Sequence, residues 1–164
     1  FRSATMTFGA AVEPAAARQH AMRNRLLLSE TFEFAASHRL HLASRTDEEN
    51  RALFGKCNNP NGHGHNYRIE VAVEVPADAG AQAAGAPGID FRSIEMIVQA
   101  EIMARFDHRH LNLDCPEFAS LNPSVENIAM VCHGLLAPRF AERGAHLQFV
   151  RVWVTDKTSC RYPA

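Results

Sequence analysis

The chain contains two segments in which apolar and polar residues alternate with a period of two, a pattern that predicts half-buried strands. In residues 26–42 one parity carries Phe32, Phe34 and other apolar side chains, while the opposite parity is largely polar. Residues 65–75 alternate in the same way. A third segment, 147–156, is apolar on both parities. A strand of that kind needs a cover on each face, so we expect the sheet to join or pack with other copies.

Two further segments show helical spacing. Residues 90–106 place apolar side chains three and four positions apart behind Asp90, which can cap a helix. A second helix is predicted over 122–140, because the opening Asn-Pro-Ser offers a capping side chain and proline is tolerated in a first turn. A short last strand is expected at 161–162. Turn-forming or polar residues predict connections at 43–50, 54–64, 77–88 and 106–121.

This order of elements predicts an α+β domain: an antiparallel four-stranded sheet with two helices on one face. We place the domain at residues 27–164. Residues 1–26 are rich in Ala and Arg with weak periodicity, and we interpret them as a leader or linker, disordered apart from a short strand at 5–11.

Composition narrows the function only slightly. The 164 residues carry a formal net charge of −1, which gives no reason to expect a nucleic-acid or membrane partner. We find no run of 18 apolar residues of the kind that spans a bilayer. The four cysteines are too sparse for a disulfide scaffold, which favours a reducing, cytoplasmic location.

Histidines supply the first candidate chemistry. His63 and His65 stand at i and i+2, so on a strand they point the same way, and His38 lies on the apolar parity of the preceding strand. If these strands are antiparallel neighbours in the right register, three imidazoles converge. Three ligands with an open fourth position describe a catalytic zinc site. Two alternatives remain open: His38 as a hydrogen-bonded core residue, and Cys57 as a fourth ligand that closes the site.

The other histidines have no comparable pattern. His41 is three residues from His38 and faces the other way on a strand. We interpret four more as surface or structural residues: His20, His110, His133 and His146.

Together, six segments resemble the 6-pyruvoyl tetrahydropterin synthase family, in the family's order and over about residues 28–162. The fourteen-residue segment that contains Cys57 is highly specific, whereas the others are individually weak. They are FxFAASHRL around His38, FGKCNNPNGHGHNY at 54–67, IDF at 89–91, FDHRHLNLD at 106–114, NPSVENIA at 122–129 and VWVTDKTSCRY at 152–162.

The resemblance implies the tunnelling fold, in which subunits form trimeric barrels that stack as homo-hexamers. It implies Zn²⁺ on the three histidines named above. It also implies that Cys57 is the catalytic proton acceptor, assisted by Asp107 and His108, and that Ser124 and Glu126 help to hold a pterin substrate. A second possibility for Asp107 and His108 is that they merely end the first helix, since histidine is favoured near a helix C-terminus.

The expected activity is therefore a zinc-dependent lyase, which converts 7,8-dihydroneopterin triphosphate to 6-pyruvoyl tetrahydropterin and triphosphate. Alternatives are the sister enzyme, 6-carboxytetrahydropterin synthase of queuosine synthesis, and a domain that binds zinc without chemistry. One departure bears on this: the family has a glutamate where this chain has Val154. That glutamate anchors the pterin ring, so we expect weak or altered binding of the standard substrate.

Overall fold

The computed structural model describes residues 25–76 and 88–164. The first 24 residues, with the predicted short strand at 5–11, lie outside the described chain, as does the connection at 77–87. Strand β1 already begins at Arg25, just before the predicted start of the domain.

The described residues form one sheet of five strands in the order β3-β1-β2-β4-β5. The prediction of four antiparallel strands was therefore incomplete, because a two-residue strand inside the predicted 106–121 connection pairs parallel with β1. The other neighbours are antiparallel. The strands are β1 (Arg25–His38), β2 (His63–Pro76), β3 (Arg109–His110), β4 (His146–Thr155) and β5 (Thr158–Tyr162).

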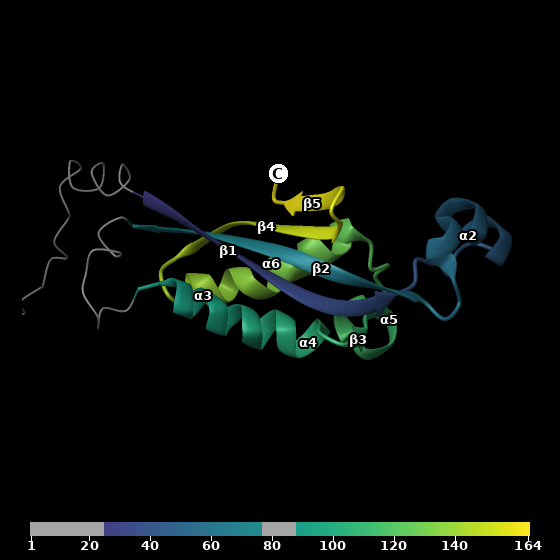
Figure 1. The fold of residues 1–164 in the computed structure, drawn as a ribbon, viewed down its shortest axis with the longest axis horizontal. Coiled ribbons are helices and arrows are strands. Elements are labelled where there is room, and N and C mark those ends of the chain that lie inside the picture. Colours follow the sequence, from purple (N-terminus) through teal and green to yellow (C-terminus); the bar gives the residue numbers. More distant parts are fainter. Residues whose placement is uncertain (1–24, 77–87) are drawn as a thin grey trace, which may run out of the picture.

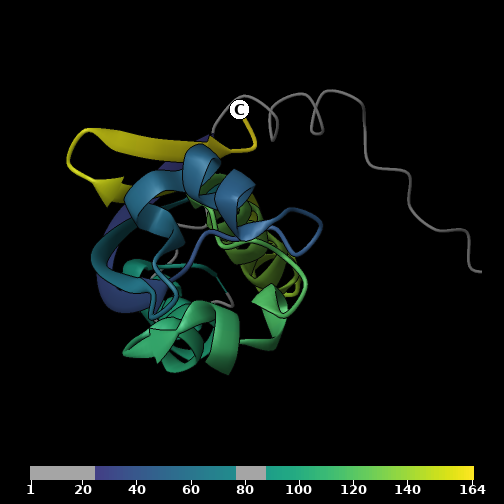
Figure 2. The same cartoon turned by 90° about the vertical axis from the view of Figure 1, so that its right-hand side faces the viewer.

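Both predicted helices are present and lie against the same face of the sheet (Figures 1 and 2). The first is a continuous run of α3 (Phe91–Val98), the π-helical turn η2 (Gln99–Met103) and α4 (Ala104–Phe106), with Asp90 as its N-cap. The second is α6 (Val125–Ala141), capped by Ser124. Their apolar residues and the inner parity of the strands form one buried core. None of the helices in the described residues is long and apolar enough to cross a membrane.

Strand β4 is apolar on both faces as expected, but one residue lies on a different face from the one predicted. A register shift opposite Ala72 and Val73 leaves Gln148 as an extra residue, so Leu147 joins Val150 on the core side. Only Phe149 and Trp153 then remain as apolar residues on the outer face. Guanidinium groups lie over those rings: Arg161 at 4.1 Å from the centroid of Phe149 and Arg68 at 4.3 Å from that of Trp153.

The predicted loop at 43–50 is also wrong in part, because residues Asp47–Phe54 form helix α2. Thr46 and Glu49 make a reciprocal capping box that starts it, a signal present in the sequence. The fully buried Asn50 then ties the helix to the preceding turn through hydrogen bonds with Leu42, Arg45 and Thr46. Helix α2 projects beyond the end of β1 and β2 (Figure 1), and the 3-10 turn η1 (Gly55–Asn58) leads back to the sheet.

The remainder of the 106–121 connection carries two short helical turns, α5 (Leu111–Asp114) and η3 (Pro116–Phe118). Leu111, Cys115 and Phe118 from this segment are buried in the core. The connection is therefore anchored in the core at intervals, and pairing of β3 with β1 fixes the residues just after α4 against the end of β1.

Candidate active site

The pairing of β1 with β2 brings three imidazoles together. His38 lies directly opposite His63, and His65 is opposite Ala36, two residues further along the same face. One ring nitrogen from each histidine lies within 4.8 Å of the others. The predicted convergence is confirmed, and it depends on the register alone because all three residues sit on regular strand.

The hydrogen-bond partner of His38 decides which of its nitrogens faces the group. Its Nδ1 lies 2.7 Å from the carbonyl oxygen of Pro123, which can only accept, so Nδ1 carries the proton. Its Nε2, 3.1 Å from Nε2 of His63, is then left with a free lone pair. Burial lowers the pKa of His38 to about 4, and burial with the charge of His63 also lowers that of His65. The neutral, metal-binding form of both rings is thus favoured.

These features fit a metal ion. In a tetrahedral zinc site the ligand nitrogens lie about 3.3 Å apart, close to the separation of the two Nε2 atoms. A carbonyl that orients a ligating histidine from behind is a usual second partner. The chain also approaches closely here: at Gly62, where φ is +72°, an added Cβ would lie 2.7 Å from His110 Nε2. Cys57 is not part of the group of converging ligand atoms, which favours a site with an open position over a closed one.

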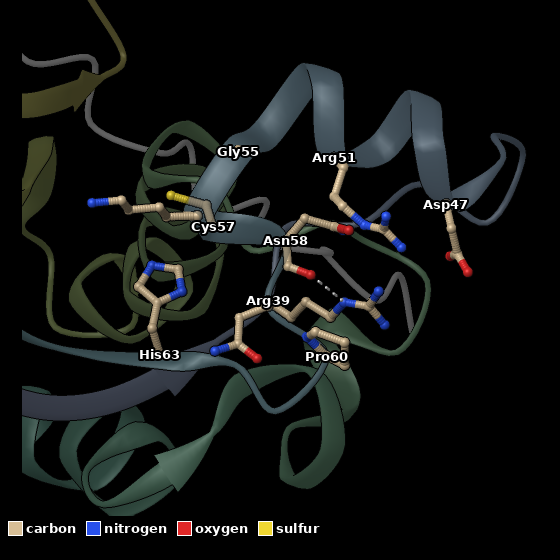
Figure 3. Close-up of a pocket in the computed structure, with 10 residues that line it drawn as sticks. Arg39, Asp47, Arg51, Gly55, Cys57, Asn58, Pro60 and His63 are labelled. Atoms are coloured by element: carbon tan, nitrogen blue, oxygen red, sulfur yellow. Dashed lines mark hydrogen bonds between the residues drawn. The ribbon is translucent and has the colours of Figure 1, made fainter.

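Cys57 is held beside this group by the backbone. It lies on η1, where its carbonyl oxygen accepts a hydrogen bond of 2.9 Å from the N–H of Leu40, two residues after His38. The neighbouring Asn58 is buried and donates to the carbonyl of Leu40 at 2.7 Å. Cys57 and His63 line the same cavity of about 650 Å³ (Figure 3). A nucleophilic sulfur and a candidate metal ligand therefore face one space.

Asp107 and His108 follow the end of α4, and they are linked to each other. His108 has a left-handed backbone (φ +57°), which allows its Nδ1 to lie 2.9 Å from Asp107 Oδ2 although the residues are adjacent. Asp107 Oδ1 accepts from the N–H of Ala35, and this bond, with His108, lowers the pKa of the carboxyl. The His108 ring is 82% exposed. Asp107 thus joins the end of the helix to β1 and orients the imidazole. A catalytic role for the pair stays a prediction.

His108 and Cys57 line different cavities in the described part of the chain. His108 lines a second cavity of about 550 Å³ together with His65 and His110, and none of its lining residues belongs to the cavity of Cys57. The metal-ligand candidates stand between the two, with His63 in one cavity and His65 in the other.

Ser124 and Glu126 lie at the start of α6. The Ser124 hydroxyl accepts from the N–H of Asn127 as the helix cap, and its hydrogen bond lowers the pKa of Glu126. Neither residue lines the cavities at His63 or His65. The sequence identified the cap, whereas a substrate contact by either residue stays a prediction.

Val154 follows the last pair of β2 with β4, Arg68 with Trp153, and it lies at a register shift between β4 and β5. Val154 is half-buried and packs against the core. The carboxylate of Asp156 cannot take the place of the glutamate that the family has at position 154. Asp156 lines a cavity with Arg68 and Trp153 on the opposite face of the sheet.

Sequence reasoning missed two residues near the histidines. His110, interpreted as surface or structural, lies on β3 with its Nδ1 buried and its Nε2 against Gly62. Its spacing of two from His108 was the available signal. Tyr67 is fully buried, its hydroxyl has no hydrogen-bond partner among the described residues, and its ring centroid is 5.5 Å from that of His65. Burial, chiefly, raises the pKa of Tyr67. Its shared parity with His65 was the signal in this case.

Comparison with known proteins agrees with this geometry. Residues 27–164 match the family model described as 6-pyruvoyl tetrahydropterin synthase. Human 6-pyruvoyl tetrahydrobiopterin synthase is 40% identical over 103 residues, 63% of this chain and 68% of that protein. The guppy (Poecilia reticulata) enzyme of the same name is 35% identical over 130 residues, 79% of this chain and 84% of its own.

Solved structures give the same result. The 6-pyruvoyl tetrahydropterin synthase of Caenorhabditis elegans superimposes with a TM-score of 0.74 at 29% identity, covering 84% of this chain and 94% of that one. The Plasmodium falciparum enzyme, at 15% identity and a TM-score of 0.54 over 85% of this chain and 97% of that one, shares the fold. With the family model covering nearly the whole described domain, the chain belongs to the 6-pyruvoyl tetrahydropterin synthase family.

Proposed function

We propose that this protein is a zinc-dependent lyase that converts 7,8-dihydroneopterin triphosphate to 6-pyruvoyl tetrahydropterin and releases triphosphate. The observation that carries the proposal is the three-histidine group opening beside a cavity with Cys57 in its wall. Membership of the family supports a pterin substrate. The histidine group and the adjoining cavity support a reaction at this site.

His38, His63 and His65 would hold the zinc ion. When bound, zinc supplies a Lewis acid that stabilises negative charge on the hydroxyl oxygens of the substrate side chain. The chain's own contribution is to present neutral imidazoles, since burial of His38 and the Pro123 carbonyl behind it favour that form.

Cys57 is the proposed proton acceptor. A hydrogen on a carbon next to a hydroxyl is a poor acid, so its removal needs a base held close to it. Two observations support this role: the Leu40 bond fixes the Cys57 backbone, and Cys57 lines the same cavity as His63. His108, oriented by Asp107, is the proposed proton shuttle on the His65 side.

A homo-hexamer built from two trimeric rings is part of the proposal. Among the described residues nothing pairs with the free edge of β1 before Ala36, or with the free edge of β5. Because β1 and β5 run in opposite directions, these edges would pair antiparallel between copies related by rotation. Closing a ring in this way removes exposed edges, which otherwise invite aggregation.

Product analysis tests the function. Incubation of zinc-loaded protein with dihydroneopterin triphosphate should yield 6-pyruvoyl tetrahydropterin and triphosphate by mass spectrometry. Cys57→Ala should abolish turnover while zinc content and fold persist, and Cys160→Ala, on β5, should retain activity. Release of acetaldehyde would instead identify a 6-carboxytetrahydropterin synthase. An intact, metal-loaded protein without turnover would indicate zinc binding without chemistry.

Metal analysis tests the site. We expect about one zinc ion per chain, because three imidazoles in this geometry form one site. His63→Ala removes a ligand and should abolish tight binding, as measured by elemental analysis after dialysis against a weak chelator. His146→Ala, at an exposed histidine, is the matched control. Full zinc content in His63→Ala would refute the assignment.

Light scattering tests the assembly. The purified protein at micromolar concentration should have the mass of a hexamer, or at least of a trimer, since the open edges of β1 and β5 need partners. A stable monomer at that concentration would contradict the proposed ring.

Val154→Glu tests the missing anchor. A carboxylate at this position of β4 would accept hydrogen bonds from the pterin amino group and the neighbouring N–H. Each such bond contributes about 1.5–3 kcal/mol. We therefore expect kcat/KM for dihydroneopterin triphosphate to rise by about tenfold or more. A wild-type protein that is already efficient, and is harmed by the change, would show that other groups hold the ring.

A further inference from the structure

The cavity beside Cys57 has a strongly asymmetric lining. It lies between the end of β1, α2 and η1, and it reaches His63 at one side (Figure 3). Three of its lining residues are cations, and a single one is a carboxylate. The charged residues are Arg39, Arg51, Lys56 and Asp47. The histidine group accounts for only one lining residue, so the proposed metal chemistry leaves this positive charge unexplained.

The arginines are not used by the fold as ion-pair partners. Neither Arg39 nor Arg51 lies within 4.0 Å of a carboxylate oxygen in any ion pair of the described residues. Their side chains extend to the same side of the cavity, away from His63 (Figure 3). Two unpaired guanidinium groups that face one hollow create a local field that attracts anions.

Hydrogen bonds hold Arg39 in place beside the cavity. Its backbone N–H and carbonyl are both bonded to the side chain of Asn112, at 2.8 and 3.0 Å. Its Nε donates to the carbonyl of Asn58 at 3.3 Å, which leaves the two terminal amino groups free. A guanidinium oriented in this manner binds a phosphate with two parallel hydrogen bonds and a small loss of side-chain freedom.

Arg51 is positioned by α2, whose next-door residue Asn50 is the buried anchor of that helix. Lys56 immediately precedes Cys57 on η1. The cations thus extend from the sulfur to the outer side of the cavity. A polyanion bound along them would have one end next to Cys57 and His63.

We propose that this cavity binds the triphosphate tail of the substrate, with Arg39, Arg51 and Lys56 as its ligands. The inference rests on the proposed lyase function and adds the part of the site that recognises the leaving group. Cys57 takes the proton from carbon, the C–O bond to triphosphate breaks, and both electrons of that bond leave with the triphosphate oxygen. The cations stabilise the negative charge that grows there.

Calorimetry with inorganic triphosphate tests the cavity without turnover. Zinc-loaded wild-type protein should bind triphosphate, and Arg51→Gln, exposed on α2, should weaken binding by about tenfold because a charge-assisted bond is lost. Arg39→Gln should have a similar effect. The matched control is Arg45→Gln, an exposed arginine outside the cavity lining, which should change binding by less than about twofold. Equal zinc content in all variants excludes an effect through the metal.

The outcomes separate this inference from the function it rests on. Arginine-dependent triphosphate binding in a protein that does not turn over dihydroneopterin triphosphate would uphold the cavity and refute the lyase. Turnover with the same KM, and the same triphosphate affinity, in wild type and both cavity variants would refute the cavity. Loss of assembly in Arg51→Gln with unchanged triphosphate binding would likewise overturn it, since the arginine would then serve an interface between copies.

Discussion

The antiparallel register of β1 against β2 is the constraint on which the candidate site depends. It sets His38 opposite His63 and leaves His65 one step along the same face. Because side chains alternate on a strand, a slip of one residue would turn these imidazoles to the outer face and bury polar residues in the core. Tyr67, Ile69 and Val71 on β2 are fully buried, so the core itself opposes such a slip. The same apolar residues that stabilise the fold therefore align the candidate metal ligands.

The segment from Arg39 to Gly62 is built on the end of that strand pair. It leaves β1 just after His38 and returns to β2 at His63. These two histidines lie opposite each other in the strand pair, so the pairing fixes both ends of the segment. Inside it, buried amides take over the role of a core: Asn50 holds the turn before α2, and Asn58 holds η1 to Leu40. Hydrogen bonds from these buried side chains thus hold the 39–62 segment in place, although it has few apolar residues to bury.

Much of the fold could be predicted from periodicity. The strands β1, β2 and β4 and both main helices were expected close to their observed bounds, and the histidine convergence followed once antiparallel pairing was assumed. The capping box of Thr46 and Glu49 was readable but was overlooked. The extra residue at Gln148 was not readable, since a bulge exists only relative to the partner strand. Strand β3 and the His108 conformation likewise depend on a long-range bond between Asp107 and Ala35. The alternation of apolar and polar residues along a strand does not predict hydrogen bonds between residues far apart in the sequence.

The three histidines lie on the sheet and Arg51 lies on α2, and this separation has an evolutionary consequence. The metal-ligand candidates belong to paired strands, on the face where Ala36 and Tyr67 are part of the core. Arg51 belongs to a solvent-facing helix that touches little of the sheet (Figure 1). Substitutions along α2 can therefore accumulate without disturbing the strands, whereas the histidines cannot move independently of the fold. A lineage with this architecture can vary the cavity lining that α2 supplies while it inherits the same arrangement of three histidines unchanged.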